Sequence, residues 1–114
     1  PPARAADARA QVAFATTAML HFRSVANQSR FTEARNRLLN NKDLSADARK
    51  KLLGQMGKII EAEAKIARRM FTVARSDSRI GYEASNHYFY LPIDLMEKVI
   101  NCRYIADHEL AGLE

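Results

Sequence analysis

The feature that most constrains the fold is a regular apolar seam between residues 45 and 76. Its members alternate four and three positions apart: Leu52, Met56, Ile59, Glu63, Ile66, Met70 and Val73. A second row flanks the seam at intervals of seven, with Leu53, Ile60, Ala67 and Ala74. This spacing is typical of an α-helix that packs lengthwise against other helices. Ser45 is a suitable N-cap, so the pattern predicts a helix from 45 to about 76.

The segment before this helix is also predicted to be helical. It is rich in alanine, and its apolar stripe consists of Val12, Ala15, Met19, Phe22 and Ala26. A polar stretch at residues 27–29 interrupts the stripe before Phe31, Ala34 and Leu38 continue it, which leaves open whether residues 4–39 form one helix or two. Asn and Asp residues within 40–43 predict the turn that follows.

The last helix is predicted to run from about 92 to 111, because Pro92 suits a first helical turn. One stripe contains Leu95, Val99, Cys102 and Ala106, and a second apolar set widens it at Ile93, Met96, Ile100 and Tyr104. A helix that is apolar on more than one side is either well covered or contacts another domain. The predicted fold class is all-α: a long antiparallel hairpin of 4–39 and 45–76 plus a C-terminal helix, in an up-down bundle.

Length and charge narrow the class of protein. The 114 residues predict a single helical domain, and the opening Pro1-Pro2 suggests a fragment or C-terminal domain of a larger polypeptide. No apolar run is long enough to span a membrane. The net charge of +5 could attract nucleic acid, but the basic residues are scattered among acids, which favours a solvated surface. The single cysteine, Cys102, excludes an internal disulfide and is interpreted as a small buried hydrophobe.

A long ordered loop at about 77–91 carries the densest group of functional side chains. The candidates for ligand binding or for bracing the loop are Glu63, Asp77, Arg79, Tyr82, Glu83, Asn86, His87, Tyr88 and Tyr90. Tyrosines with an amide and an imidazole can stack on a sugar and hydrogen-bond to it. The alternative is structural, since the same groups can bury their rings and satisfy loop backbone.

Glu63 is the exception in the apolar seam. A carboxylate at a core-facing position needs a specific partner. We interpret it as a brace for the loop, bonded to Arg79, a tyrosine hydroxyl or backbone amides; the alternative is that it lines a polar pocket with loop residues. Gly54 and Gly57, on the same helix, could allow a neighbour to approach closely.

Residues 76–104 resemble a known family. The run from Asp77 to Tyr90, followed by Asp94, Leu95, Glu97 to Val99, Asn101 and Cys102, looks like the C-terminal helical region of large bacterial glycoside-hydrolase-like proteins of the α-glucuronidase-like sort. The resemblance implies an accessory region that packs on a catalytic barrel carried elsewhere in the polypeptide. It assigns no catalytic role to any residue here.

Two functional hypotheses follow. The first is an accessory C-terminal domain of a carbohydrate-active enzyme, whose loop shapes a sugar pocket or a domain interface. The second is a free-standing helical module for protein–protein interaction that uses the wide last helix. A basic nucleic-acid binder is a weaker third. No complete catalytic site, metal-ligand pair or cofactor motif is recognisable, and the sequence does not indicate a compartment.

Overall fold

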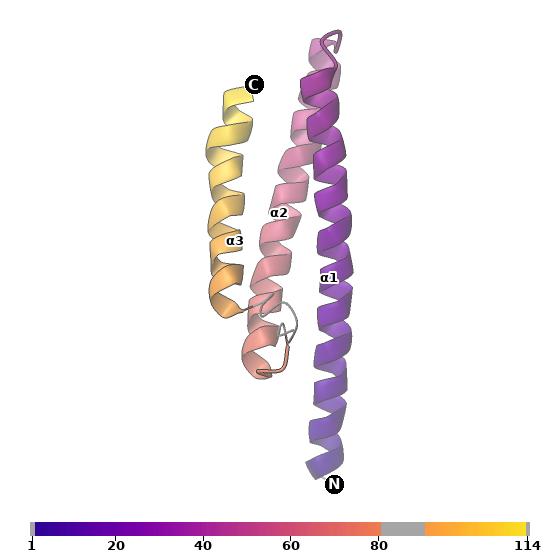
Figure 1. Cartoon of the computed structure of the whole chain (residues 1–114), viewed down its shortest axis with the longest axis vertical. Coiled ribbons are helices and arrows are strands. Elements are labelled where there is room, and N and C mark those ends of the chain that lie inside the picture. The colour runs from indigo at the N-terminus through magenta and orange to yellow at the C-terminus, as the bar shows by residue number, and fades with distance from the viewer. Residues whose placement is uncertain (1, 81–90, 114) are drawn as a thin grey trace.

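The described part of the chain forms three α-helices, which run side by side along the long axis of the molecule (Figure 1). The computed structural model describes residues 2–80 and 91–113. In it, α1 spans Pro2–Asn40, α2 spans Ala46–Ser76 and α3 spans Pro92–Tyr104. A short π-helix, Ile105–Leu110, and a 3₁₀ turn, Ala111–Leu113, continue α3. The predicted all-α fold, an antiparallel hairpin with a third helix packed on it, is confirmed.

The first arm is one continuous helix, which resolves the question that the sequence left open. Its polar interruption does not break it, and the Ser29 hydroxyl donates a hydrogen bond to the Val25 carbonyl of the same helix at 3.1 Å. Its first turns extend beyond the end of α2 (Figure 1). Alanine has the highest helix propensity, which accounts for helix formation where little packing is available.

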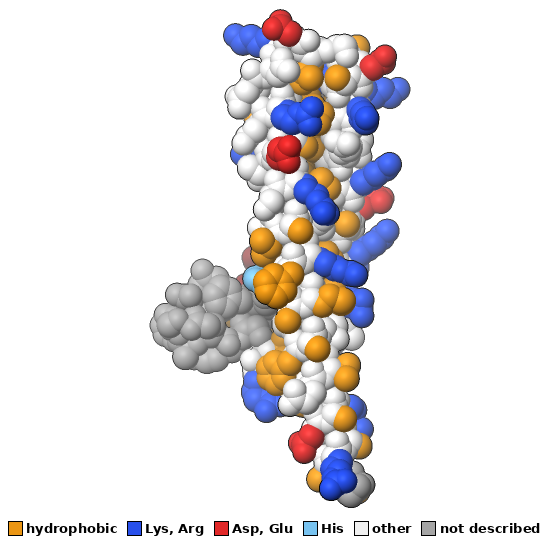
Figure 2. Space-filling model, turned by 90° about the vertical axis from the view of Figure 1, so that its right-hand side faces the viewer, with side chains coloured by type: hydrophobic (Ala, Val, Ile, Leu, Met, Phe, Trp, Pro, Cys, Tyr) orange, Lys and Arg blue, Asp and Glu red, His pale blue; other side chains and the backbone are white. Residues whose placement is uncertain are grey.

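The face that α1 buries differs from the predicted stripe. The buried residues are Leu20, Ser24, Ala34 and Leu38. Val12 and Phe22, from the predicted stripe, are 65% and 71% exposed. The physical reason is that alanine is compatible with both a buried and an exposed face, so an Ala-rich helix specifies its inward side weakly. Figure 2 shows the resulting surface, with apolar side chains exposed along this arm beside Lys and Arg.

The turn between α1 and α2 is built as the sequence predicts. The Asn41 side-chain oxygen accepts a hydrogen bond from the Asp43 backbone N–H at 3.1 Å. The Ser45 hydroxyl accepts one from the Ala48 N–H at 3.2 Å and so caps α2. The two helices are therefore joined by a short connection that makes them antiparallel neighbours.

α2 lies between the other two helices and packs against both. Its most buried residues are Leu52, Leu53, Met56, Ile60, Glu63, Ala67, Met70 and Ala74. Ile59, Ile66 and Val73 of the predicted seam are only half-buried. The centre of the buried face is thus shifted toward the predicted flanking row, because a helix with neighbours on two sides must bury a broader face than a single seam.

The core consists of two apolar clusters. The first lies toward the α1–α2 turn and contains Ala34, Leu38, Leu52, Leu53, Met56, Ile60, Cys102 and Leu110. The second lies toward the other end and contains Leu20, Ala67, Met70, Ala74, Ile80 and Leu95. The buried polar residues Ser24 and Glu63 fall between them along α1 and α2. Cys102 is buried as predicted, and burial raises the pKa of its thiol.

No helix in the described part of the chain has the length and hydrophobicity needed to cross a membrane.

The prediction that Gly54 and Gly57 admit a close neighbour is wrong. A Cβ atom built at either position would meet no atom within 4 Å beyond the adjacent residues and the nearby backbone of α2 itself. Both glycines therefore weaken α2 without improving its packing.

We expect Gly54→Ala to raise the free energy of unfolding by about 0.5–1 kcal/mol, because alanine loses less conformational freedom in a helix and finds open space here. Urea unfolding followed by circular dichroism measures the change. A destabilised variant would show that another surface approaches Gly54 closely.

Candidate functional site

The centre of the molecule holds a buried polar cluster contributed by all three helices. Glu63 of α2 is only 6% exposed. One of its carboxylate oxygens, Oε2, accepts a hydrogen bond from the Ser24 hydroxyl at 2.8 Å and lies 2.7 Å from the Lys98 ammonium of α3. The other oxygen, Oε1, accepts from the Asn27 side-chain amide at 2.8 Å. A single carboxylate therefore links α1, α2 and α3.

Ser24 completes this cluster. Its hydroxyl donates to Glu63 and accepts from the Gln28 amide at 3.0 Å and from the Lys98 ammonium at 2.9 Å. One donor and two acceptor positions are all that a serine hydroxyl offers, so its hydrogen-bonding capacity is fully used. Within residues 2–80 and 91–113, no buried side-chain nitrogen or oxygen lacks a partner.

The burial of Glu63 follows from its place in the seam, but the proposed partner Arg79 is wrong. Glu63 bonds to Ser24, Asn27 and Lys98, whereas Arg79 pairs with Asp77. The physical reason is distance, since Asp77 stands fourteen positions after Glu63, at the end of α2 and about 20 Å along the helix axis. The sequence does contain a pattern that indicates Lys98 as a partner. Lys98 stands three residues after Leu95 and four before Cys102, so helical spacing places it on the core side of the last helix.

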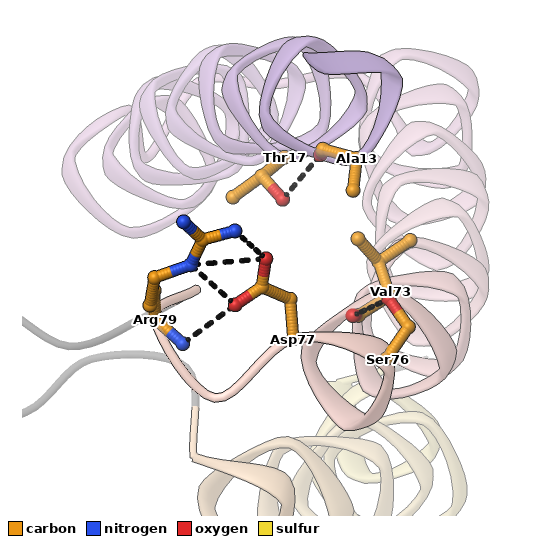
Figure 3. A network of polar contacts seen from close by, with 6 residues as sticks. All are labelled: Ala13, Thr17, Val73, Ser76, Asp77 and Arg79. Atoms are coloured by element: carbon orange, nitrogen blue, oxygen red, sulfur yellow. Dashed lines mark hydrogen bonds and ion pairs between the residues drawn. The ribbon is translucent and has the colours of Figure 1, made fainter. Parts of the chain in front are cut away.

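Asp77 and Arg79 pair with each other (Figure 3). The Arg79 guanidinium donates to both carboxylate oxygens of Asp77, with a shortest contact of 2.6 Å, and the Arg79 backbone N–H donates at 3.0 Å. The side-chain hydrogen bond from Arg79 is the main cause that lowers the pKa of Asp77 to about 2. This pair shapes the chain where it leaves α2, and Ile80 is buried directly after it.

Six of the loop candidates lie outside the described residues: Tyr82, Glu83, Asn86, His87, Tyr88 and Tyr90. Of the predicted set, the structure therefore locates Glu63, Asp77 and Arg79, and it does not bring Glu63 together with the other two. Arg79 instead lies over the ring of Phe14, with its Cζ 5.5 Å from the ring centre.

A groove runs beside the buried cluster, between α1 and α3. It forms a cavity of about 420 Å³ that is open to solvent, and its lining includes Phe31 from α1, Ile59 and Ile60 from α2, and Ile105 after α3. Its polar lining includes Asn27, Gln28, Glu63, Asp94, Glu97, Lys98 and Asn101. The sequence did not reveal this groove, because its residues come together only when α1 and α3 pack on the same helix.

The outward side of α3 carries a second surface. Ile93, Met96, Ile100 and Tyr104 are each more than half exposed. Met96 and Ile100 also line an apolar cleft of about 340 Å³ between α3 and α2, together with Phe71, Leu95, Val99 and Arg68. The predicted second apolar side of the last helix is therefore present, and its side chains are exposed.

Neither surface has the features of a metal centre. Among the residues that the structure describes, no group of three or more His, Cys, Asp or Glu side chains could hold a metal ion.

Comparison with known proteins assigns this chain to no family, since no family model, curated protein or solved structure matches it.

We expect Glu63→Gln to lower the free energy of unfolding by about 1–3 kcal/mol, because the Lys98 ammonium loses its counter-charge. The cost stays below that of a fully buried pair, since the Lys98 side chain is 29% exposed and can reach water. Combining Glu63→Gln with Lys98→Met should cost less than the two single changes added together.

Arg103→Ala is the matched control, because it breaks the exposed ion pair with Asp107, at 2.7 Å, on the surface of the last helix. In urea unfolding, that change should lower the free energy of unfolding by less than about 0.5 kcal/mol. Equal costs for Glu63→Gln and Arg103→Ala, or strictly additive costs at Glu63 and Lys98, would contradict a stabilising role for the cluster.

Proposed function

We propose that this chain is a helical protein-interaction module that binds a folded partner through the outward face of α3. The observation that carries this proposal is the exposed apolar stripe on that helix. Ile93, Met96, Ile100 and Tyr104 are 61%, 51%, 64% and 56% exposed. Single exposed apolar residues are ordinary, but a contiguous set is typical of an interaction surface.

The stripe is separate from the side by which α3 packs on the bundle. At about 100° per residue, its four members fall within an arc of about 80°, roughly opposite the buried Leu95 and Cys102. A helix that served only this bundle would carry polar side chains there. The second apolar side therefore supports a second packing partner.

The chemistry beside the stripe specifies the partner further. The cleft between α3 and α2 joins the stripe through Met96 and Ile100 and offers the ring of Phe71. Arg68 lines this cleft, and the Arg75 guanidinium lies over the Phe71 ring with Cζ 5.5 Å from its centre. An apolar patch with acidic residues along the edge that meets Arg68 and Arg75 would complement this surface, so that is the partner chemistry we propose.

The accessory-domain hypothesis is a narrower form of this proposal. In that form the partner is the catalytic domain of a carbohydrate-active enzyme within the same polypeptide, and the α3 face is its docking surface. The free-standing form places the partner on another chain. Both require the same exposed stripe, and the sugar-contacting part of the hypothesis rests on loop residues outside the described ranges.

Photo-crosslinking tests the proposal in the polypeptide as its source cells produce it. We expect p-benzoylphenylalanine at Ile100 to give one discrete product, mapped by mass spectrometry to an apolar, acid-edged surface. Ile93→Asp should abolish that product while leaving the circular dichroism unchanged, because Ile93 contributes little to the core at 61% exposure. A cross-link within one polypeptide supports the accessory form, and a cross-link between chains supports the free-standing form.

The control places the same probe at Glu61, an exposed position on α2. Identical products from positions 61 and 100 would contradict the proposal. So would a product at position 100 that survives Ile93→Asp.

A further inference from the structure

We propose that the groove between α1 and α3 binds a small organic cation, an amine or guanidine carried on an apolar body. This site lies on a different side of α3 from the exposed stripe, so it does not depend on the proposed protein partner. Three properties of the groove favour such a ligand: its shape, its charge and the hydrogen-bonding groups that it leaves open.

The cavity has the size and walls of a small-molecule site. Its volume of about 420 Å³ falls within the range of about 300–1,000 Å³ in which small ligands bind. Phe31, Ile59 and Ile105 provide apolar surface from three different segments. A ligand with an aromatic or aliphatic body would remove this surface from water, which favours binding.

The groove is acidic although the chain is basic. Its lining contains the carboxylates of Glu63, Asp94 and Glu97 and the ammonium of Lys98, so three negative charges and one positive charge leave −2. The whole chain carries +5. Glu63 and Lys98 neutralise each other at 2.7 Å, which assigns the excess to Asp94 and Glu97. Neither of these two carboxylates has an ion-pair or hydrogen-bond partner within residues 2–80 and 91–113.

The amides of the groove add acceptor oxygens to this charge. Asn27 donates its amide N–H to Glu63, and Gln28 donates its amide N–H to Ser24, so both side chains direct donors into the buried cluster. The Asn27 Oδ1 and Gln28 Oε1 oxygens receive no hydrogen bond from the part of the chain that the structure describes. A ligand rich in N–H donors would satisfy them, whereas an anion would meet the unpaired carboxylates.

An organic cation fits these groups better than a metal ion does. The described residues contain no cluster of three or more metal-ligating side chains, and the lining combines apolar walls with amides. Metal ions such as Mg²⁺ and Ca²⁺ require several oxygen ligands converging on one point. An ammonium on an apolar body uses both the walls and the acceptors.

Titration with 2-phenylethylamine, compared with the uncharged 2-phenylethanol of the same shape, tests the proposal. In two-dimensional NMR spectra we expect the amine to shift the signals of Phe31, Asn101 and Ile105 and to bind at least fivefold more tightly than the alcohol. Asp94→Asn combined with Glu97→Gln should remove that fivefold preference and leave the weak binding of the alcohol unchanged, which also shows that the groove is intact.

Glu61→Gln is the matched control, because it removes an exposed carboxylate of α2 that does not line the groove. It should keep the preference for the amine. The proposal is overturned if amine and alcohol bind equally, if the Asp94 and Glu97 variant retains the preference, or if the shifted signals lie outside the groove. Should the double variant lose its structure, Glu97→Gln alone allows the same comparison of amine with alcohol, and the preference for the amine should then fall by less.

Discussion

The structure depends on one buried carboxylate and the groups that satisfy it. Glu63 stands in the middle of α2, with an apolar cluster on each side of it along the bundle. Burying a carboxylate is costly unless it is paired and hydrogen-bonded, so the fold must bring Ser24, Asn27 and Lys98 to the same point. Apolar contacts between helices tolerate sliding and rotation, whereas hydrogen bonds of 2.7–2.8 Å do not. We infer that this polar layer sets how the three helices align.

Both candidate surfaces are consequences of that alignment. Lys98 must point toward Glu63, which fixes the rotation of α3 about its axis. With this rotation Leu95 and Cys102 face the core, while Ile93 and Ile100 face outward. Asp94 and Glu97 then line the groove beside α1. On α1, the same layer engages the donors of Asn27 and Gln28. The groove and the outward stripe are thus positioned by the polar centre of the bundle.

The sequence predicted what local chemistry determines. The helices and the Ser45 cap follow from neighbouring residues, and the structure contains both. The burial of Glu63 also followed, because its seam is regular. The partners of Glu63 could not be predicted, because they depend on how α1 and α3 are rotated about their own axes. An Ala-rich helix such as α1 specifies that rotation only weakly. The groove needed the packed arrangement of three helices, so no single stretch of sequence could indicate it.

The central claim is that the polar layer specifies the alignment of the helices, and a distance distribution tests it most directly. Spin labels would be placed at Glu33 on α1 and Asp107 after α3, both exposed, in a Cys102→Ala background. The parent should give one narrow distance distribution by pulsed electron paramagnetic resonance. Replacing the layer with apolar residues, by Ser24→Ala, Glu63→Leu and Lys98→Met, should keep the chain helical but give a broad or multiple distribution. A single narrow distribution at the parent distance in that triple variant would contradict the claim.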